Sequence, residues 1–257
     1  MNEWSEWGVN EAEFWYQYGL DSLIHKTRMV EFTKSGIDAY VKFKIESRSF
    51  SNPEIVFHHE LSYDFISTGD LVINHKIMPD VEPVSLYTKD WFPMGYIQKV
   101  GLQFTLAEGI EKISWYGRGP QESYPDRKTG YKTGQYEMNI NDIKIPYIIP
   151  QDFDNRTDLR WMSVHSSGGS GLLITSNSLF NSSINPYENL DKAWYPFQLK
   201  RTKNPVLNID HQVTGVGGTP VRVRPVYRTY PKNYEYKLLL RPFNRNPDFY
   251  RMSNIEF

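Results

Sequence analysis

Alternation of apolar and polar residues with a period of two recurs along this chain and restricts its fold more than any other feature. Four segments alternate cleanly and are bounded by Gly, Pro, Asn or Asp, namely residues 39–45, 71–77, 100–106 and 234–240. Successive side chains of a β-strand point to opposite faces, so these segments predict half-buried strands separated by turns. Residues 171–175 predict another short strand, preceded by a hairpin turn at 166–170.

Helical periodicity is scarce. Residues 10–17, with an Asn at the start, and residues 187–193 are the two short candidates. Strands spaced about every ten residues are typical of a sandwich or barrel, and 15% aromatic residues suit sheet surfaces. No internal repeat or low-complexity linker interrupts the pattern. We therefore expect residues 1–257 to form a single all-β domain.

The charge balance argues against two classes of partner. The chain has 29 basic and 30 acidic residues, a net charge of −1, and so lacks the field that attracts nucleic acid or anionic membranes. The chain has no run of eighteen apolar residues, so it is not expected to contain a membrane-spanning helix. Its first residues do not resemble a signal peptide. The absence of cysteine excludes disulfides, a thiol nucleophile and a thiolate metal site.

Two tracts resemble a known family. Residues 115–127 read W-Y-G-R-G-P-Q-E-S-Y-P-D-R, and residues 146–161 read P-Y-I-I-P-Q-D-F-D-N-R-T-D-L-R-W. With L-N-I-D at 207–210 and G-V-G-G at 215–218, they resemble the last domain of β-galactosidases of glycoside hydrolase family 2. The hallmarks there are W-x-G-x-G-P-x-E-x-Y-x-D-R and P-Y-x-x-P-[QS]-E-x-x-x-R. The resemblance covers nearly the whole chain, and its first tract is highly specific.

This resemblance implies a large antiparallel β-sandwich, the supersandwich related to galactose mutarotase, packed beside a catalytic (β/α)8 barrel. In the family, the barrel carries two glutamates that hydrolyse terminal β-D-galactose residues with retention, their carboxyl groups about 5–5.5 Å apart. The sequence contains nothing like that barrel, so the isolated chain is expected to be inactive. The implied partners are the catalytic barrel and a galactoside. Na⁺ or Mg²⁺ ligands belong to other domains of the family, so no cofactor or metal is expected in this chain.

Departures from the family pattern concern the expected cleft. A Trp that follows G-V-G-G in many relatives is absent, and Gly217 and Gly218 lead instead to Arg222 and Arg224. We expect these four residues, together with Trp161, to line the cleft or bind carbohydrate. The family's T-H-R-H-E-L stretch is replaced by residues 193–199, and P-Q-E appears as P-Q-D at 150–152. The substrate therefore stays open, as does a bacterial cytoplasmic or periplasmic location.

The charged residues of the two tracts predict a structural role. The acids and arginines concerned are Arg118, Glu122, Asp126, Arg127 and Arg156. Arg forks and carboxylates this close in sequence favour ion pairs that order a long loop. The alternative is that some of them contact sugar hydroxyls.

Other functions and assemblies remain open at this point. A free-standing aldose epimerase would use His165, His211 and Glu122 as acid and base. A carbohydrate-binding module would use exposed Trp91, Trp161 or Trp194. His58 and His59 are adjacent in a strand and point to opposite faces, which disfavours a shared metal. The family's R-A-P segment is absent before Trp4, which predicts a domain trimmed at its N-terminus, with an exposed edge that favours a homo-oligomer.

Overall fold

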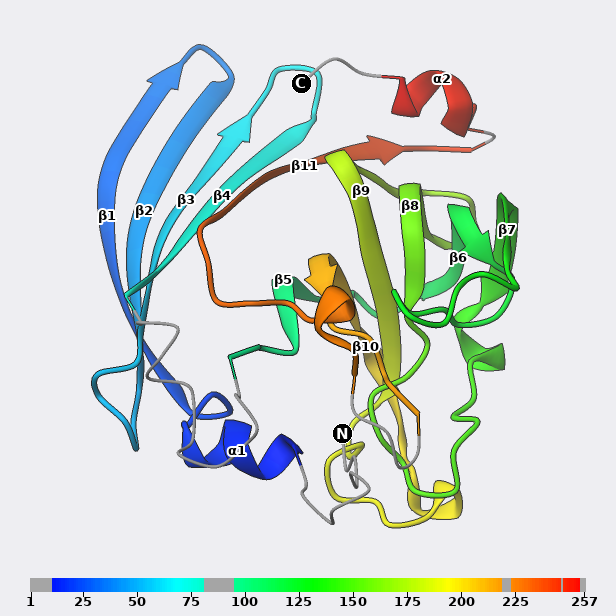
Figure 1. Ribbon diagram of the computed structural model, residues 1–257. Helices are drawn as coiled ribbons and strands as arrows, with labels where there is room; N and C mark the ends of the chain where they lie inside the picture. The colour runs from blue at the N-terminus through cyan, green and yellow to red at the C-terminus, as the bar shows by residue number, and fades with distance from the viewer. Residues whose placement is uncertain (1–10, 81–94, 219–222, 246, 255–257) are drawn as a thin grey trace. The chain divides into compact units, whose positions relative to one another are not determined.

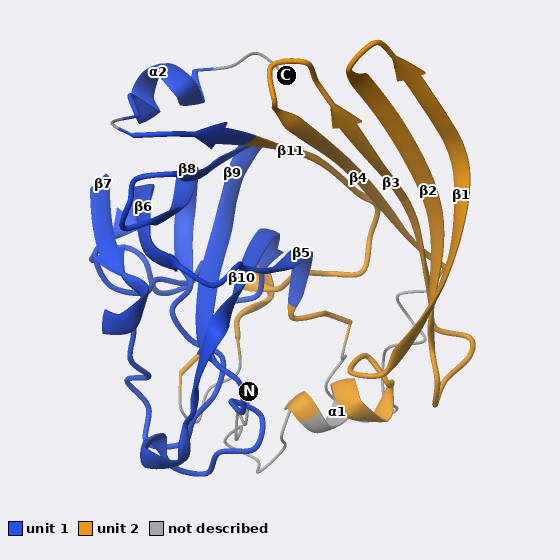
Figure 2. Ribbon diagram, turned by 180° about the vertical axis from the view of Figure 1, so that it is seen from behind, with its two compact units in different colours: residues 1, 99–216, 241–257 blue, residues 2–98, 217–240 orange. Residues whose placement is uncertain are grey.

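The computed structural model describes residues 11–80, 95–218, 223–245 and 247–254 (Figure 1). Antiparallel strands dominate these residues, so the predicted all-β class is confirmed. Within the described residues, no helix is both long enough and apolar enough to cross a membrane. The chain divides into two compact units (Figure 2): unit 1 holds residues 99–216 and 241–257, and unit 2 holds residues 2–98 and 217–240. The expectation of a single domain over residues 1–257 stays a prediction.

Unit 2 is built on an antiparallel meander. Its strands, in hydrogen-bonded order, are β1 (Leu23–Ser35), β2 (Asp38–Ser49), β3 (Val56–Phe65), β4 (Leu71–Asp80) and the first part of β11 (Tyr234–Phe243). The register places Tyr40, Val41 and their neighbours on β2 directly opposite Asp64 and Tyr63 on β3. Each predicted alternating segment in this unit therefore lies inside a strand.

The helix α1 (Glu11–Gln17) packs its Trp15 ring edge-on against Tyr96, at 5.8 Å between ring centroids. The Trp15 indole also donates to the Tyr96 carbonyl at 3.1 Å, and both side chains are buried. The prediction of a short helix over residues 10–17 is thus confirmed. A short 3₁₀ turn, η3 (Pro225–Tyr227), lies in the sequence just before β11, the last strand of the unit 2 sheet.

Strand β1 forms one edge of the unit 2 sheet. It pairs with β2, and within the described residues no other strand pairs with it. Nearly all of its residues are exposed, including the apolar side chains of Ile24, Met29 and Phe32. An unpaired edge of this kind can associate with another strand. Homo-oligomerisation remains a prediction.

Unit 1 contains a second antiparallel series of strands. In hydrogen-bonded order these are β7 (Lys132–Asn139), β6 (Ile110–Gly119), β8 (Arg156–Ser166), β9 (Gly171–Tyr187), β10 (Arg201–Val213) and β5 (Lys99–Thr105). The 3₁₀ turns η1 (Ile140–Asp142) and η2 (Pro196–Gln198), the end of β11, and the helix α2 (Phe249–Ser253) complete the unit. Fully buried apolar side chains fill its interior, among them Ile113, Trp115, Leu159, Met162, Leu173 and Phe180.

Two local predictions have different outcomes in unit 1. The predicted hairpin turn joins β8 to β9 through the backbone bond from Ser166 N to Ser170 O at 3.0 Å. The predicted helix over residues 187–193 is wrong, because β9 continues to Tyr187 and a loop follows. The Asn189 side chain explains the loop: it accepts from Lys200 N at 2.8 Å and donates to Gln198 O at 3.0 Å, which joins the two ends.

Candidate functional site

The G-P-Q-E-S-Y-P-D-R loop of unit 1 leaves the end of β6 through two closely packed glycines. A Cβ at Gly117 would lie 2.5 Å from the Leu159 side chain, and one at Gly119 would lie 2.7 Å from the Tyr136 ring. Neither position has room for a larger residue. Trp115 is fully buried, and its indole donates to the Arg118 carbonyl at 3.0 Å. The loop therefore has a fixed starting direction.

Glu122 is the centre of the loop's hydrogen bonding. Its carboxylate accepts from the Arg127 guanidinium, from the Tyr147 hydroxyl, and from the Asp154 backbone N–H at 2.9 Å. Burial and the hydrogen bond to Glu122 raise the pKa of Tyr147 to about 12. Burial alone would lower the pKa of Arg127, but Tyr147 and Glu122 together raise it. The Tyr147 hydroxyl and the Arg127 guanidinium therefore both hold their protons across the physiological range.

Arg156 and Asp154 form a buried two-pronged ion pair. The Arg156 Nη1 and Nη2 atoms lie 2.7 and 2.8 Å from the two Asp154 carboxylate oxygens. The guanidinium also lies over the Trp115 ring, 4.4 Å from its centroid, and Arg156 is 1% exposed. Asp154 has a positive φ of 65°, a conformation that is uncommon for residues other than glycine. The ion pair and the backbone turn fix one another.

Asp158 joins the loop to β8. Its carboxylate oxygens accept from Arg118 Nε at 3.0 Å and from Lys128 Nζ at 2.7 Å. Burial raises the pKa of Asp158, but these two cations outweigh burial and lower it overall. The carboxyl is therefore ionised at neutral pH and holds both ends of the 118–128 segment.

Asp126 connects the loop to the G-V-G-G segment. Its Oδ1 accepts from the Val216 backbone N–H at 3.0 Å. A Cβ at Gly215 would lie 2.4 Å from the Asp126 carboxyl carbon, so a glycine is needed there for this approach. The conformation of the segment that precedes Gly217 thus depends on Asp126.

A buried charge cluster lies where β5 and β10 pair. Lys99 Nζ lies 2.6 Å from Asp152 Oδ2, and Asp210 is 4% exposed. The Asp210 Oδ2 atom has no hydrogen-bond partner among the described residues. Burial raises the pKa of Asp210 to about 7, although the charge of Lys99 opposes the rise. Sequence reasoning missed Lys99 altogether and treated Asp210 only as part of a family motif.

The five residues expected to line a cleft have different environments. Gly217 has a positive φ of 65°, and a Cβ at Gly218 would meet nothing within 4 Å. Arg224 is exposed, whereas Arg222 lies outside the described residues. Trp161 does not fit the expectation: it is 3% exposed and packs against Phe249 at 4.9 Å between ring centroids. Both faces of β8 are covered at this point, because every side chain from Trp161 to Val164 is buried.

The five residues of the expected ion-pair loop are all engaged. Arg127 pairs with Glu122, Arg118 with Asp158, and Arg156 with Asp154. Asp126 accepts a hydrogen bond from the Val216 backbone N–H. The three candidates for epimerase chemistry have separate partners: Glu122 bonds Arg127, His165 lies 3.3 Å from Ser114 Oγ, and His211 lies 3.5 Å from Ser178 Oγ.

Unit 2 contains a hydrogen-bonded chain with one side chain from each of its five strands. Its links are His25 Nδ1 to Ser47 Oγ at 2.7 Å, Ser47 Oγ to His59 Nε2 at 3.0 Å, His59 Nδ1 to His75 Nε2 at 3.0 Å, and His75 Nδ1 to Tyr236 OH at 2.9 Å. Burial lowers the pKa of His59 to about 4 and that of His75 to about 3. Both rings are therefore neutral near pH 7. His58 is not in the chain and lies 3.8 Å from Asp80.

Three aromatic side chains are exposed on the loop after β9. Trp194, Tyr195 and Phe197 are 69%, 51% and 83% exposed. The Tyr195 and Phe197 rings stack 5.6 Å apart with only 6° between their planes. Gln198 Oε1 accepts from the backbone N–H groups of Trp194 and Tyr195 at 2.8 and 3.1 Å, which orders the turn. Trp91, the other exposed candidate, lies outside the described residues.

Comparison with known proteins identifies similar chains. The family model described as "Beta galactosidase small chain" matches residues 1–240. A β-galactosidase of Priestia megaterium is 27% identical over 237 residues, which are 90% of this chain and 21% of that protein. A β-galactosidase of Pseudoalteromonas haloplanktis is 33% identical over 182 residues, 69% of this chain and 16% of that protein.

Among solved structures, a GalM/aldose epimerase homologue from C. elegans is similar with a TM-score of 0.41 and 11% sequence identity, covering 84% of this chain and 69% of that one. The chain spans about a fifth of the length of the first two curated relatives it matches.

Proposed function

The chain belongs to the β-galactosidase small-chain family, and we propose that it serves as a non-catalytic domain of a family 2 β-galactosidase. In this proposal a larger enzyme hydrolyses terminal non-reducing β-D-galactose residues with retention. The domain completes the active-site cleft and shields it from water. The catalytic barrel of that enzyme and a galactoside are its partners.

The observation that carries this proposal is the hydrogen bond that the Val216 backbone N–H donates to the Asp126 carboxylate. In the family's two tracts, the acidic side chains Glu122, Asp154 and Asp158 accept direct hydrogen bonds from Arg127, Arg156 and Lys128, which order the loop. Asp126 extends that ordered loop to the backbone of the G-V-G-G segment. A segment held this way can form a cleft wall without contributing a reacting group.

The electrostatics of the loop support a non-catalytic role. A glycosidase general acid needs a carboxyl that keeps its proton near neutral pH and can reach the substrate. The pKa of the Asp158 carboxyl is lowered. The Glu122 carboxylate accepts hydrogen bonds from Arg127 and Tyr147. Asp210 has a pKa near 7, but its side chain is 4% exposed and cannot contact a sugar.

A chromogenic galactoside assay tests the proposal. The chain alone should give no turnover, and mixing it with the amino-terminal portion of the proposed enzyme should restore activity. Asp126→Asn should lower kcat/KM of the mixture about tenfold, because the amide weakens the charge-assisted bond to Val216. Asp142→Asn, on η1 and away from the loop, is the matched control and should change little. Turnover by the chain alone would overturn the proposal.

Carbohydrate binding is a second candidate function, and the exposed rings of Trp194, Tyr195 and Phe197 favour it. Aromatic faces stack on the apolar faces of sugars, and exposed aromatic clusters commonly mark binding surfaces. Titration with galactose and lactose should then give a saturable heat that Trp194→Ala removes. Equal heats for the native chain and Trp194→Ala would reject this candidate.

A further inference from the structure

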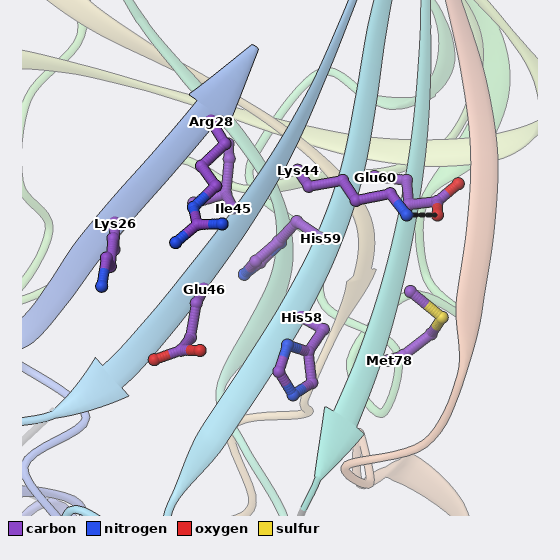
Figure 3. A pocket seen from close by; sticks show the side chains of 9 residues that line it. All are labelled: Lys26, Arg28, Lys44, Ile45, Glu46, His58, His59, Glu60 and Met78. Atoms are coloured by element: carbon purple, nitrogen blue, oxygen red, sulfur yellow. Dashed lines mark ion pairs between the residues drawn. The ribbon is translucent and has the colours of Figure 1, made fainter. Parts of the chain in front are cut away.

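Unit 2 contains a cavity of about 480 Å³ that is distant in sequence from the loop of unit 1. Four strands line it: β1 gives Lys26 and Arg28, β2 gives Lys44 and Glu46, β3 gives His58 and Glu60, and β4 gives Met78 (Figure 3). Pockets of roughly 300–1,000 Å³ hold small metabolites. The cavity is therefore large enough for a ligand the size of a sugar phosphate.

The strand register places two like charges directly opposite each other at this cavity. Arg28 on β1 faces Lys44 on β2 in the antiparallel pairing. Directly opposed like charges destabilise a sheet. Lys44 turns toward Glu60, with 3.6 Å between Nζ and the carboxylate (Figure 3). Arg28 is left facing a cation, an arrangement that a bound anion would relieve.

Each of the two acids that line the cavity has a cationic partner outside the lining, Arg48 for Glu46 and Lys42 for Glu60. Glu46 accepts from Arg48 at 3.0 and 3.1 Å, although it lies opposite Lys26 in the register. Glu60 lies 2.7 Å from Lys42, and the hydrogen bond from Lys42 lowers the pKa of Glu60. Lys26 and Arg28 form no ion pair with any described residue. The cavity therefore has positive charge that its own acids do not balance.

The types of these cations point to a particular ligand chemistry. An arginine fork binds two oxygens of a phosphate group at once, and a lysine adds a mobile point charge. Met78 supplies apolar surface beside the charged groups. We propose that this cavity binds a phosphate-type oxyanion, either free or carried on a small sugar. The proposal does not depend on the β-galactosidase role of the chain.

Titration of the full 257-residue chain at constant ionic strength tests the proposal. The ligands are inorganic phosphate, a hexose phosphate and the unphosphorylated hexose, with binding followed by calorimetry and by NMR shifts of β1 and β2. Phosphate and the hexose phosphate should bind saturably. Equal affinity for the two would identify the free anion as the ligand, and at least tenfold tighter binding of the hexose phosphate would identify the sugar-linked form.

Matched variants separate a built site from general attraction to positive charge. Arg28→Gln should weaken binding at least tenfold, and Arg28→Lys should recover only part of the loss because it restores charge without the fork. Lys34→Gln removes the same charge from an exposed position of β1 outside the cavity lining and should weaken binding less than twofold. Unfolding midpoints of the variants verify folding, which the exposure of Arg28 favours.

Three results would overturn the proposal. The first is the absence of saturation with either phosphate ligand. The second is equal weakening by Arg28→Gln and Lys34→Gln, which would show non-specific attraction. The third is binding of the neutral hexose as tightly as its phosphate, which would show that the anion is not what the cavity recognises.

Discussion

Unit 1 holds charged side chains in opposite-charge pairs, whereas unit 2 holds two neutral histidines, His59 and His75, in a series of side chains that hydrogen-bond to one another. In unit 1, Arg156 and Asp154 lie two residues apart and Arg127 and Glu122 lie five apart. In unit 2, the chain from His25 to Tyr236 takes one residue from each of five strands. Both arrangements satisfy polar atoms that water cannot reach.

The two arrangements respond differently to pH and to mutation. A buried ion pair is held by mutual charge, so removing one partner leaves an uncompensated charge. A neutral histidine avoids that desolvation, but its pKa falls, so acid destabilises it. Unit 1 also holds the buried acid Asp210, whose raised pKa gives the opposite dependence on pH. The following substitutions test this contrast.

The largest effect is expected from Arg156→Ala. The change leaves the Asp154 carboxylate buried without its partner and empties the space over Trp115. Loss of one member of a buried pair costs about 3–5 kcal/mol, so the free energy of unfolding should fall by that amount. Urea unfolding measures it, and amide exchange should show lost protection in β6 and β8 but not in β2 and β3. Arg160→Ala, at an exposed position of β8, is the control; a loss below about 1 kcal/mol for Arg156→Ala would contradict the ion-pair role.

His75→Asn should remove much of the acid sensitivity of unit 2. The folded-state pKa of His75, about 3, lies below its ordinary value of 6.5. Between these values the unfolded chain binds a proton that the folded chain does not. The stabilisation is therefore complete above pH 6.5 and is lost as the pH falls, by about 2 kcal/mol at pH 5.

Unfolding of the native chain and of His75→Asn between pH 7 and 5 measures this difference. The variant should lose about 2 kcal/mol less than the native chain. His58→Asn, which is outside the hydrogen-bonded chain, should keep the full acid dependence. Identical pH profiles for the native chain and His75→Asn would show that the buried ring does not titrate as inferred.

Asp210→Asn should act in the opposite direction in unit 1. The folded-state pKa of Asp210, about 7, lies above its ordinary value of 3.8, so the folded chain holds a proton that the unfolded chain has released. The stabilisation that this proton gives the folded chain is complete below pH 3.8 and is lost as the pH rises through 7. The free energy of unfolding should fall by about 2 kcal/mol between pH 5 and 7. The variant should lack this decline, as measured by amide exchange in β10. Asp142→Asn is the exposed control, and a decline of the native size in Asp210→Asn would refute the assignment.

Arg127→Ala should have the smallest effect of the series. The Arg127 side chain is 43% exposed, and Glu122 keeps its bonds from Tyr147 and the Asp154 backbone after the change. Partly exposed ion pairs contribute up to about 1 kcal/mol, so the unfolding midpoint should drop by a few degrees. Calorimetry measures it, with Arg224→Ala as an exposed control. An unchanged midpoint would mean that this arginine does not stabilise the loop.

In the candidate site, residues whose partners lie nearby in the sequence could be predicted, and residues whose partners are distant could not. Arg118, Glu122, Arg127 and Arg156 could be selected from sequence because their partners lie in the same two tracts. Trp161 was expected at a surface but is buried, since a single sequence does not reveal that both faces of β8 are covered from Trp161 to Val164. Lys99 gave no signal, because its partners Asp152 and Asp210 are more than fifty residues away.

The sequence by itself determined the all-β class, the positions of five strands (β2, β4, β5, β9 and β11) and the family, because period-two alternation and local motifs depend on neighbouring residues. Tertiary structure decided which polar groups share a buried environment. The series from His25 to Tyr236 and the cavity beside Arg28 depend on strand register, and register depends on pairing between segments far apart in the chain. Side chains that are unremarkable in their own segments acquire shifted pKa values and charge imbalance only after those strands pair.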